Sequence, residues 1–309
     1  MKKIFFSLKP PEGSYGGGGF FVKNLSQFLT NNNYQVTYTL DDDIDILFII
    51  DPRRGPNKRY GLQNFLHYKK THPNTTIVYR VNECDIKRDV SINIEPLIVK
   101  TIEFADKVVF ISKWLQDYFI KKYKLVLDDY IYILNGCNPD IFFPGEEKKD
   151  LSQIKIITHH WSYNYLKGFH IYNQLDKIME AKNIQFTFVG QYNQQYKPKN
   201  IKLIKPKHGL ELSNIIRSHN IYLTASQNEP CGNHHIEGIA CGLPILYCKN
   251  GGGIKESCDG VGEEFKSLDE FFQKLEKIVN NYDTYVKNID YNFLSSTRCC
   301  EQYLTYLKY

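Results

Sequence analysis

Two glutamates, Glu229 and Glu237, stand eight positions apart in a segment rich in glycine and histidine. The first precedes an expected helix and the second lies in its second turn, so the two carboxylates would flank the helix start. An ionised carboxylate accepts hydrogen bonds from hydroxyl groups more strongly than a neutral amide does. The pair therefore indicates a site for a polyol such as a sugar.

The helix start between these glutamates is the second chemical feature. It follows an expected strand at 220–224, and Asn233 is a residue type that caps helices, which predicts a helix from there to Cys241. The first N–H groups of a helix lack partners within it, and its dipole is positive at this end. The segment from Gly232 to His235 would therefore cradle an anion. The two carboxylates and this anion-binding helix start together suit a sugar nucleotide, which carries both hydroxyl groups and a diphosphate.

A glycine cluster at 16–19 lies between the first expected strand and the first expected helix. Glycine lets a backbone approach a phosphate closely, so the cluster is either a phosphate-binding loop or a flexible one. The dinucleotide fingerprint would require glycine at position 21, which is Phe21. A nicotinamide-dependent oxidoreductase therefore loses its main support. The acidic run 41–43 could grip a ribose or a metal, but it is more typical of a solvated turn.

The elements that would position these candidate sites alternate along the chain. Short apolar segments, expected to form strands, alternate with amphipathic segments, expected to form helices. That alternation is typical of doubly wound parallel sheets. Strands are expected at 3–8, 34–40, 46–50, 76–81, 107–111 and 131–134, then at 154–158, 185–190, 201–204, 220–224 and 244–248. Helices are expected at 20–30, 63–71, 95–105 and 113–122, then at 168–181, 210–217, 233–241 and 268–279. Turn and charged residues at 135–150 separate the two series, which predicts two Rossmann-like α/β domains, 1–150 and 151–292, facing a cleft.

Length and composition agree with two folded domains. The 309 residues are 42% apolar and 24% charged, a globular mixture. Lysine and arginine number 39 against 34 acidic residues, and the resulting charge of +5 is spread along the chain. This mild excess favours anionic small molecules, or peripheral contact with a membrane surface, and gives no indication of nucleic-acid binding.

Targeting signals and cysteine spacing predict a cytoplasmic protein. The apolar run at 4–8 is shorter than the roughly seven residues of a signal peptide core, and no run approaches the roughly 18 residues of a membrane span. The eight cysteines contain no Cys-x-x-Cys pair. The adjacent His234 and His235 lack the i, i+4 spacing of a zinc helix, so no metal site is expected.

The order of these motifs resembles that of the retaining glycosyltransferases of family 4, whose two-domain arrangement is called GT-B. The strongest match is the Glu-x7-Glu segment with Gly232, followed by Gly242-x-Pro244 and the glycines at 251–252. Weaker matches follow the expected order over nearly the full chain: the glycines at 16–19, the segment 105–112, Asn135-Gly136 and Lys167-Gly168. The resemblance implies a GT-B fold whose C-terminal helix, 293–309, crosses back to the N-terminal domain.

The resemblance also implies an activity: a retaining, metal-independent hexosyltransferase without a cofactor. It would move a hexose from a nucleotide diphosphate sugar, of UDP or GDP type, to a hydroxyl of a glycan or lipid-linked acceptor. The donor would bind the C-terminal domain and the acceptor the N-terminal one. The departing phosphate would itself take the acceptor's proton, so no protein base is expected. Fixed N–H groups and an ammonium would stabilise the charge on the leaving diphosphate.

By the same resemblance, Glu237 would hold the ribose hydroxyls and Glu229 the hydroxyls of the donor sugar. Lys167 would neutralise the diphosphate. Further donor-binding positions are Gly17, Gly18, Gly232, Asn233 and His234. Lys207 would lie near the nucleotide base.

Three positions depart from the family pattern. Relatives carry an arginine shortly before the lysine that matches Lys167, whereas this chain offers His160 or Ser162 for part of that grip. Where relatives place a His or Asp beside the donor sugar, Asn82 and Asp85 are the candidates. Gly238 replaces the usual alanine, which costs about 1 kcal/mol of helix propensity unless close packing needs it.

Other functions stay open at this stage. A nucleotide-sugar binding protein without transfer activity and a nucleotide-sugar isomerase on the same fold would both use these motifs. The basic loop 53–59 could meet a phosphorylated or lipid-linked acceptor, or could simply be solvated.

Overall fold

The computed structural model describes residues 1–10, 17–55, 59–90, 92–179, 182–192 and 196–308. Gly16 and part of the basic loop 53–59 lie outside these ranges. The chain forms two compact units. The first comprises Met1–Asp85, Ile92–Asn135 and Cys299–Tyr309, and the second comprises Ile86–Ser91 and Gly136–Arg298.

The first unit is built on a six-stranded sheet of order β2-β1-β3-β4-β5-β6, in which every neighbouring pair is parallel. Its strands are β1 (Lys2–Phe6), β2 (Tyr34–Thr37), β3 (Ile46–Ile49), β4 (Thr76–Val81), β5 (Lys107–Phe110) and β6 (Tyr130–Tyr132). Its helices are α1 (Gly17–Asn31), α2 (Leu62–Thr71), α3 (Glu95–Phe104) and α4 (Lys113–Tyr123), and the short helix η1 (Asp85–Lys87) follows β4. The expected alternation of strand and helix is confirmed here.

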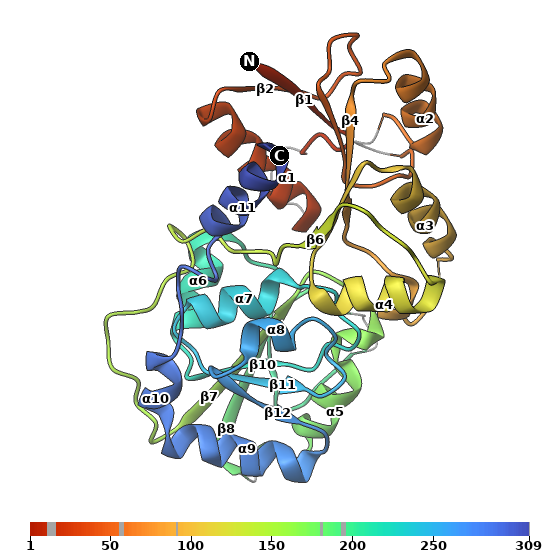
Figure 1. Ribbon diagram of the computed structural model, residues 1–309. Coiled ribbons are helices and arrows are strands. Elements are labelled where there is room, and N and C mark those ends of the chain that lie inside the picture. Colours follow the sequence, from red (N-terminus) through yellow and green to blue (C-terminus); the bar gives the residue numbers. More distant parts are fainter. Residues whose placement is uncertain (11–16, 56–58, 91, 180–181, 193–195, 309) are drawn as a thin grey trace. The chain divides into compact units, whose positions relative to one another are not determined.

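The C-terminal helix α11 (Ser296–Lys308) packs into the core of the first unit, beside α1 (Figure 1). The Tyr303 ring lies 4.9 Å from that of Phe21 and 5.8 Å from that of Phe48, measured between centroids. Cys299, Leu304 and other residues of one helix face complete this contact. Burial of that apolar stripe explains why the last segment joins elements far away in the sequence.

The second unit repeats the architecture with sheet order β12-β11-β10-β7-β8-β9, again parallel throughout. Its strands are β7 (Ile154–His160), β8 (Ile184–Gly190), β9 (Lys202–Ile204), β10 (Ile221–Thr224), β11 (Ile245–Cys248) and β12 (Gly262–Phe265). Its helices are α5 (Phe169–Asp176), α6 (Gly209–Arg217), α7 (Asn233–Ala240), α8 (Lys255–Cys258), α9 (Leu268–Asn280) and α10 (Tyr282–Lys287), with the short helix η2 (Tyr165–Lys167) before α5.

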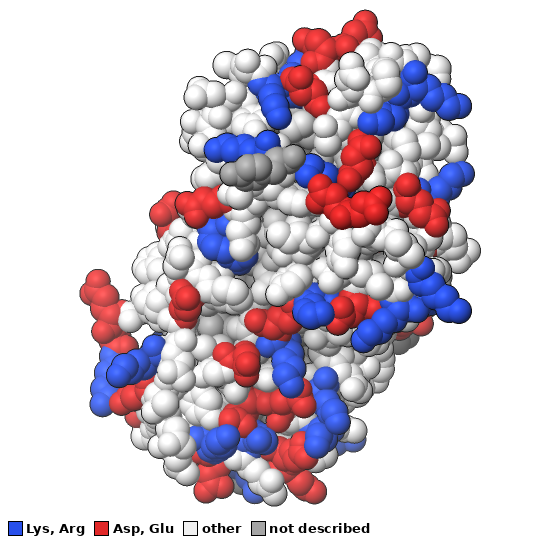
Figure 2. Space-filling view, viewed as in Figure 1, with Lys and Arg blue, Asp and Glu red and all other residues white. Residues whose placement is uncertain are grey.

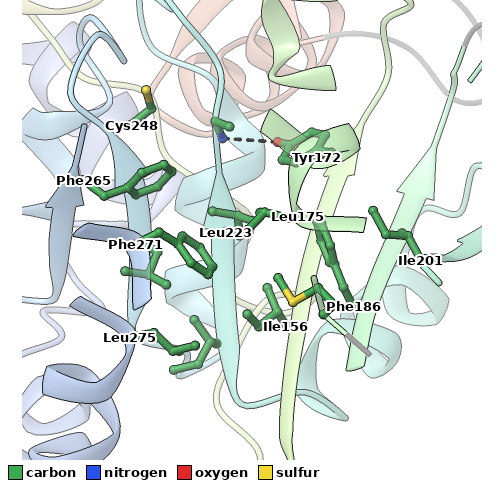
Figure 3. Close-up of a cluster of buried hydrophobic side chains, with 14 of the residues drawn as sticks. Ile156, Tyr172, Leu175, Phe186, Ile201, Leu223, Cys248, Phe265, Phe271 and Leu275 are labelled. Atoms are coloured by element: carbon green, nitrogen blue, oxygen red, sulfur yellow. Dashed lines mark hydrogen bonds between the residues drawn. The ribbon is translucent and has the colours of Figure 1, made fainter. Parts of the chain in front are cut away.

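The core of the second unit fills the space between this sheet and the helices α5 and α9. Figure 3 shows Leu223 of β10 and Ile156 of β7 between Phe271 of α9 and Leu175 of α5. The Tyr172 hydroxyl accepts a hydrogen bond from the Ala225 backbone N–H at 3.2 Å, just after β10. The end of β10 is thereby fixed, and the loop that carries Glu229 starts from this point.

Charge and helix length add two observations. On the face drawn in Figure 2, basic and acidic side chains are interspersed rather than gathered into one patch, in keeping with the small net charge of +5. Within the described ranges, every helix is too short or too polar to traverse a bilayer.

Candidate active site at the start of helix α7

Helix α7 begins at Asn233, and its N-cap is Gly232 in an extended conformation. The prediction that Asn233 caps the helix is therefore wrong by one residue. Gly232 has no side chain to accept a hydrogen bond from the helix start, so the first N–H groups are not satisfied by their own cap. A Cβ at Gly232 would lie 2.6 Å from the His234 ring and 3.2 Å from the Glu229 side chain. Only glycine fits between them.

Glu229 is positioned by a second glycine segment. Its backbone N–H donates to Gly251 O at 3.2 Å, and its carbonyl accepts from Gly253 N at 2.9 Å. Gly252, between them, has a φ of +72°, and a Cβ there would lie 2.7 Å from the Glu229 carbonyl oxygen. The left-handed conformation and the close approach both require glycine. The motif glycines after β11 thus hold the backbone of Glu229.

A buried ion pair joins Glu229 to Lys167, the last residue of η2. The Lys167 Nζ donates to Glu229 Oε2, and the Glu229 side chain is about nine-tenths buried. Burial by itself would raise the pKa of Glu229, but the ammonium of Lys167 and, after it, that of Lys87 bring the pKa down to about 2. Glu229 is therefore ionised at neutral pH, and a carboxylate and an ammonium lie at the start of α7.

The carboxylate of Glu237, in helix α7, makes the second polar contact of this site, with His159. Its Oε2 lies 2.8 Å from His159 Nε2, at the end of β7. The other ring nitrogen, Nδ1, lies 2.9 Å from the Tyr222 hydroxyl of β10. The chain Tyr222–His159–Glu237 fixes the orientation of a carboxylate that remains partly exposed. Such a carboxylate can accept hydrogen bonds from vicinal hydroxyls.

Three further histidines surround this pair and are uncharged at neutral pH. Burial lowers the pKa of His160 and of His234 well below the usual value, and lowers the pKa of His235 to about 3. His160 Nε2 lies 2.9 Å from the Tyr172 hydroxyl, so its ring faces the interior. Any part that His160 has in the grip on the diphosphate would thus be that of a neutral ring, and this part stays a prediction. His234 Nε2 lies 2.9 Å from Thr224 Oγ1.

Metal binding finds no support in this cluster. Over the part of the chain that the structure describes, no group of three or more His, Cys, Asp or Glu side chains has the arrangement of a metal site. His160 and His234 instead contact hydroxyl groups, and the centroids of their rings lie 4.8 Å apart.

Comparison with known proteins adds independent information. No family model matches the chain. It is 26% identical over 210 residues to a probable sucrose-phosphate synthase of Thermosipho melanesiensis, a match that covers 62% of this chain and 50% of that protein. The chain thus spans about half the length of this curated relative.

Solved structures match over almost the whole chain. The sucrose-phosphate synthase of Thermosynechococcus elongatus has a TM-score of 0.72 at 13% identity, covering 100% of this chain and 98% of that one. The Anabaena protein HepE, in complex with UDP and glucose, has a TM-score of 0.71 at 15% identity, covering 100% and 99%. The chain has the GT-B fold. Two parallel six-stranded sheets with flanking helices are its basis, as the alternation of strands and helices predicts.

Four of the predicted site residues belong to the first unit. Gly17 and Gly18 belong to the first unit and form the first turn of α1, where a preceding loop was expected. Asp85 also lies in the first unit, and its carboxylate accepts from the N–H groups of Ile94 and Glu95 at 3.1 and 3.3 Å. It thus caps the start of α3. Asn82 follows β4 and is partly exposed.

Two basic residues named above, Lys207 and Arg53, form ion pairs with carboxylates close to them in the sequence. Lys207 lies 2.5 Å from Glu211, one helical turn further along. Arg53 in the basic loop is bound by the carboxylate of Asp51, with Nη2 2.7 Å from Oδ2. Arg53, at least, is therefore paired within its own segment.

Acid is expected to destabilise this GT-B chain through its buried histidines. The folded-state pKa is about 3 for His235 and about 4 for His219, below the usual 6.5. As pH falls below 6.5 the unfolded chain takes up protons first, so stability present above pH 6.5 is lost progressively toward those values. The loss is about 1.4 kcal/mol for each pH unit and each such histidine. Urea unfolding at pH 8, 6 and 5 measures it.

His235→Leu supplies the specific comparison. Both ring nitrogens of His235 are buried without a hydrogen-bond partner among the described residues. The substitution should make the decrease of unfolding free energy between pH 8 and 5 shallower, while His67→Gln, on an exposed side chain of α2, should leave it unchanged. Equal slopes for wild type and His235→Leu would contradict this assignment.

Proposed function

We propose that the protein is a glycosyltransferase that transfers a hexose from a nucleotide diphosphate sugar, of UDP or GDP type, to a hydroxyl of a glycan or lipid-linked acceptor. The proposal rests on the groups that lie at the start of α7. There a helix N-terminus without a side-chain cap, the Lys167 ammonium and two carboxylates, Glu229 and Glu237, lie together in the second unit. A helix N-terminus and an ammonium suit a diphosphate, and the two carboxylates suit the hydroxyl groups of a ribose and a hexose.

The GT-B fold and its neighbours support the same conclusion. HepE has been crystallised with UDP and glucose, and WaaG, described as a glycosyltransferase involved in lipopolysaccharide biosynthesis, has a TM-score of 0.61 at 13% identity, covering 96% of this chain and 98% of that one. The curated relative is a probable sucrose-phosphate synthase. Transfer of a sugar, the activity named for WaaG, is what we propose for this chain.

The proposed step breaks the bond between the sugar C1 and the diphosphate oxygen and forms a bond from C1 to the acceptor oxygen. The acceptor's proton passes to the departing phosphate, so no protein base is required. The N–H groups at the start of α7 and the Lys167 ammonium stabilise the charge on the diphosphate without reorganising. Attack on the face that the leaving group occupies would retain the anomeric configuration.

Individual roles are proposed from the family resemblance. Glu237, oriented by His159, binds the ribose hydroxyls, and Glu229 binds the hydroxyls of the donor sugar. Backbone groups at Gly232, Asn233 and His234 meet the diphosphate, and Lys207 lies toward the base. Gly17, Gly18 and Asn82 belong to the first unit, and their part in donor binding stays a prediction. Asp85 would act by ordering the segment after β4, because its carboxylate already caps α3.

The experiment that tests this proposal is donor turnover over a panel of UDP-, GDP- and dTDP-sugars, with and without simple glycan acceptors. We expect slow hydrolysis of one donor class and retention of the anomeric configuration, read by NMR. Binding without turnover on any acceptor would instead identify a binding protein. A new nucleotide sugar formed without acceptor would identify an isomerase.

Removal of divalent cations should leave this turnover unchanged. Lysine ammonium groups and helix N–H groups supply the positive charge, so a chelator is expected to alter the rate by less than about twofold. In enzymes where a metal stabilises the leaving group, that metal contributes several kcal/mol. A large loss on chelation, restored by Mg²⁺ or Mn²⁺, would contradict the metal-independent mechanism.

A further inference from the structure

The segment Ile86–Ser91 belongs by its contacts to the second unit, although its neighbours in the sequence belong to the first. Two asparagines of the second unit hold its backbone. Asn164 Nδ2 donates to the Lys87 carbonyl at 2.7 Å, and Asn228 Nδ2 donates to the Ile86 carbonyl at 3.1 Å. Asp89 adds a bond from its N–H to Asn164 Oδ1 at 3.3 Å.

The same two asparagines also position the ion pair of the candidate site. Asn164 caps η2, since its Oδ1 accepts from Leu166 N at 3.0 Å and its carbonyl accepts from Lys167 N at 3.0 Å. Asn228 directly precedes Glu229 and adopts a left-handed φ of 50°. The backbone segments that carry Lys87, Lys167 and Glu229 are therefore linked through Asn164 and Asn228.

Charge at this site is not balanced by Lys167 alone. Its ammonium is paired with Glu229, while Glu237 adds a second carboxylate to the same helix start. His160, His234 and His235 are neutral because burial lowers their pKa values. A diphosphate brings further negative charge to these groups. The Lys87 backbone lies one hydrogen bond from Asn164, which caps the turn that ends at Lys167, and the charge of Lys87 helps to lower the pKa of Glu229.

We propose that Lys87 is a second cation for the donor diphosphate, acting beside Lys167. This inference rests on the proposed function and adds to it a residue that no motif indicates. When the donor binds, the Lys167 ammonium interacts with both Glu229 and the diphosphate. The Lys87 ammonium then supplies the additional positive charge that the diphosphate needs. The segment 86–91 thereby contributes to the chemistry of the unit on which it docks.

The test compares a charged ligand with an uncharged one. Calorimetry is carried out with UDP and with uridine on wild type, Lys87→Met and Lys87→Arg. We expect Lys87→Met to weaken UDP binding about tenfold or more, because a charge-assisted hydrogen bond is lost. Uridine affinity should stay unchanged, and Lys87→Arg should retain most of the UDP affinity. Lys177→Met, on an exposed residue at the end of α5, makes the same change of charge and should have no effect.

Three outcomes separate the possibilities. Unchanged UDP affinity in Lys87→Met overturns the role of Lys87. Equal weakening of UDP and uridine binding also overturns it, because the residue would then act only on the structure of the site. If wild type binds neither UDP nor GDP, the proposed function itself fails, which is distinct from the first two results.

Discussion

Glu229→Gln is expected to reduce donor turnover by about a hundredfold or more and to lower the free energy of unfolding by about 3 kcal/mol. The first loss follows from removing the carboxylate proposed to bind the donor sugar, by analogy with single polar groups that stabilise transition states. The second follows because the Lys167 ammonium loses its partner in a largely buried setting. Turnover of the preferred donor and urea unfolding at pH 7.5 measure the two effects.

Two further variants separate stability from catalysis. Glu229→Gln combined with Lys167→Met removes both charges, so it should recover much of the lost stability without recovering turnover. Glu211→Gln breaks the exposed pair with Lys207 on α6, and should change stability by no more than about 0.5 kcal/mol. Wild-type turnover in Glu229→Gln would show that this carboxylate takes no part in donor binding.

Gly238→Ala is expected to destabilise the protein by about 2 kcal/mol, although alanine is the better helix former. A Cβ at Gly238 would lie 2.2, 2.4 and 2.7 Å from ring atoms of Tyr222. The gain of about 1 kcal/mol in helix propensity is smaller than the 1–3 kcal/mol that overpacking typically costs. Thermal or urea unfolding of the variant measures the net change.

The same substitution should weaken nucleotide binding, because Tyr222 orients His159 and through it Glu237. Combining Gly238→Ala with Tyr222→Leu should show favourable coupling, since the smaller side chain relieves the clash. Gly18→Ala in α1 is the matched stability control. A Cβ there meets only Leu8 at 3.7 Å, so that variant should not lose stability. A Gly238→Ala variant as stable as wild type would contradict the packing argument.

Sequence patterns predicted the alternation of strands and helices well, because each central strand is a short buried run. They missed β12, whose sequence Gly-Glu-Glu-Phe looks like an exposed turn. Glu263 in that strand is buried, and it accepts from Lys274 of α9 at 2.8 Å and from Tyr285 of α10 at 2.5 Å. Figure 1 shows α9 alongside β12. Lys274 and Tyr285 lie 11 and 22 residues beyond Glu263, so the sequence around Glu263 does not indicate that it is buried.

The motif region of the candidate site could also be predicted in part. Glu229, Gly232 and Glu237 do lie around a helix start, as their spacing indicates. The sequence does not show whether His159 or His160 faces α7, because alternate residues of a strand face opposite sides. Lys87 was missed for a different reason: its segment docks on the second unit through long-range bonds from Asn164 and Asn228.

The most direct test of the central claim is a crystal structure of the protein with UDP. We expect the diphosphate at the N-terminus of α7, within hydrogen-bond distance of Lys167, with the ribose hydroxyls on the carboxylate of Glu237. A nucleotide bound elsewhere, or bound at α7 with its ribose away from Glu237, would contradict it.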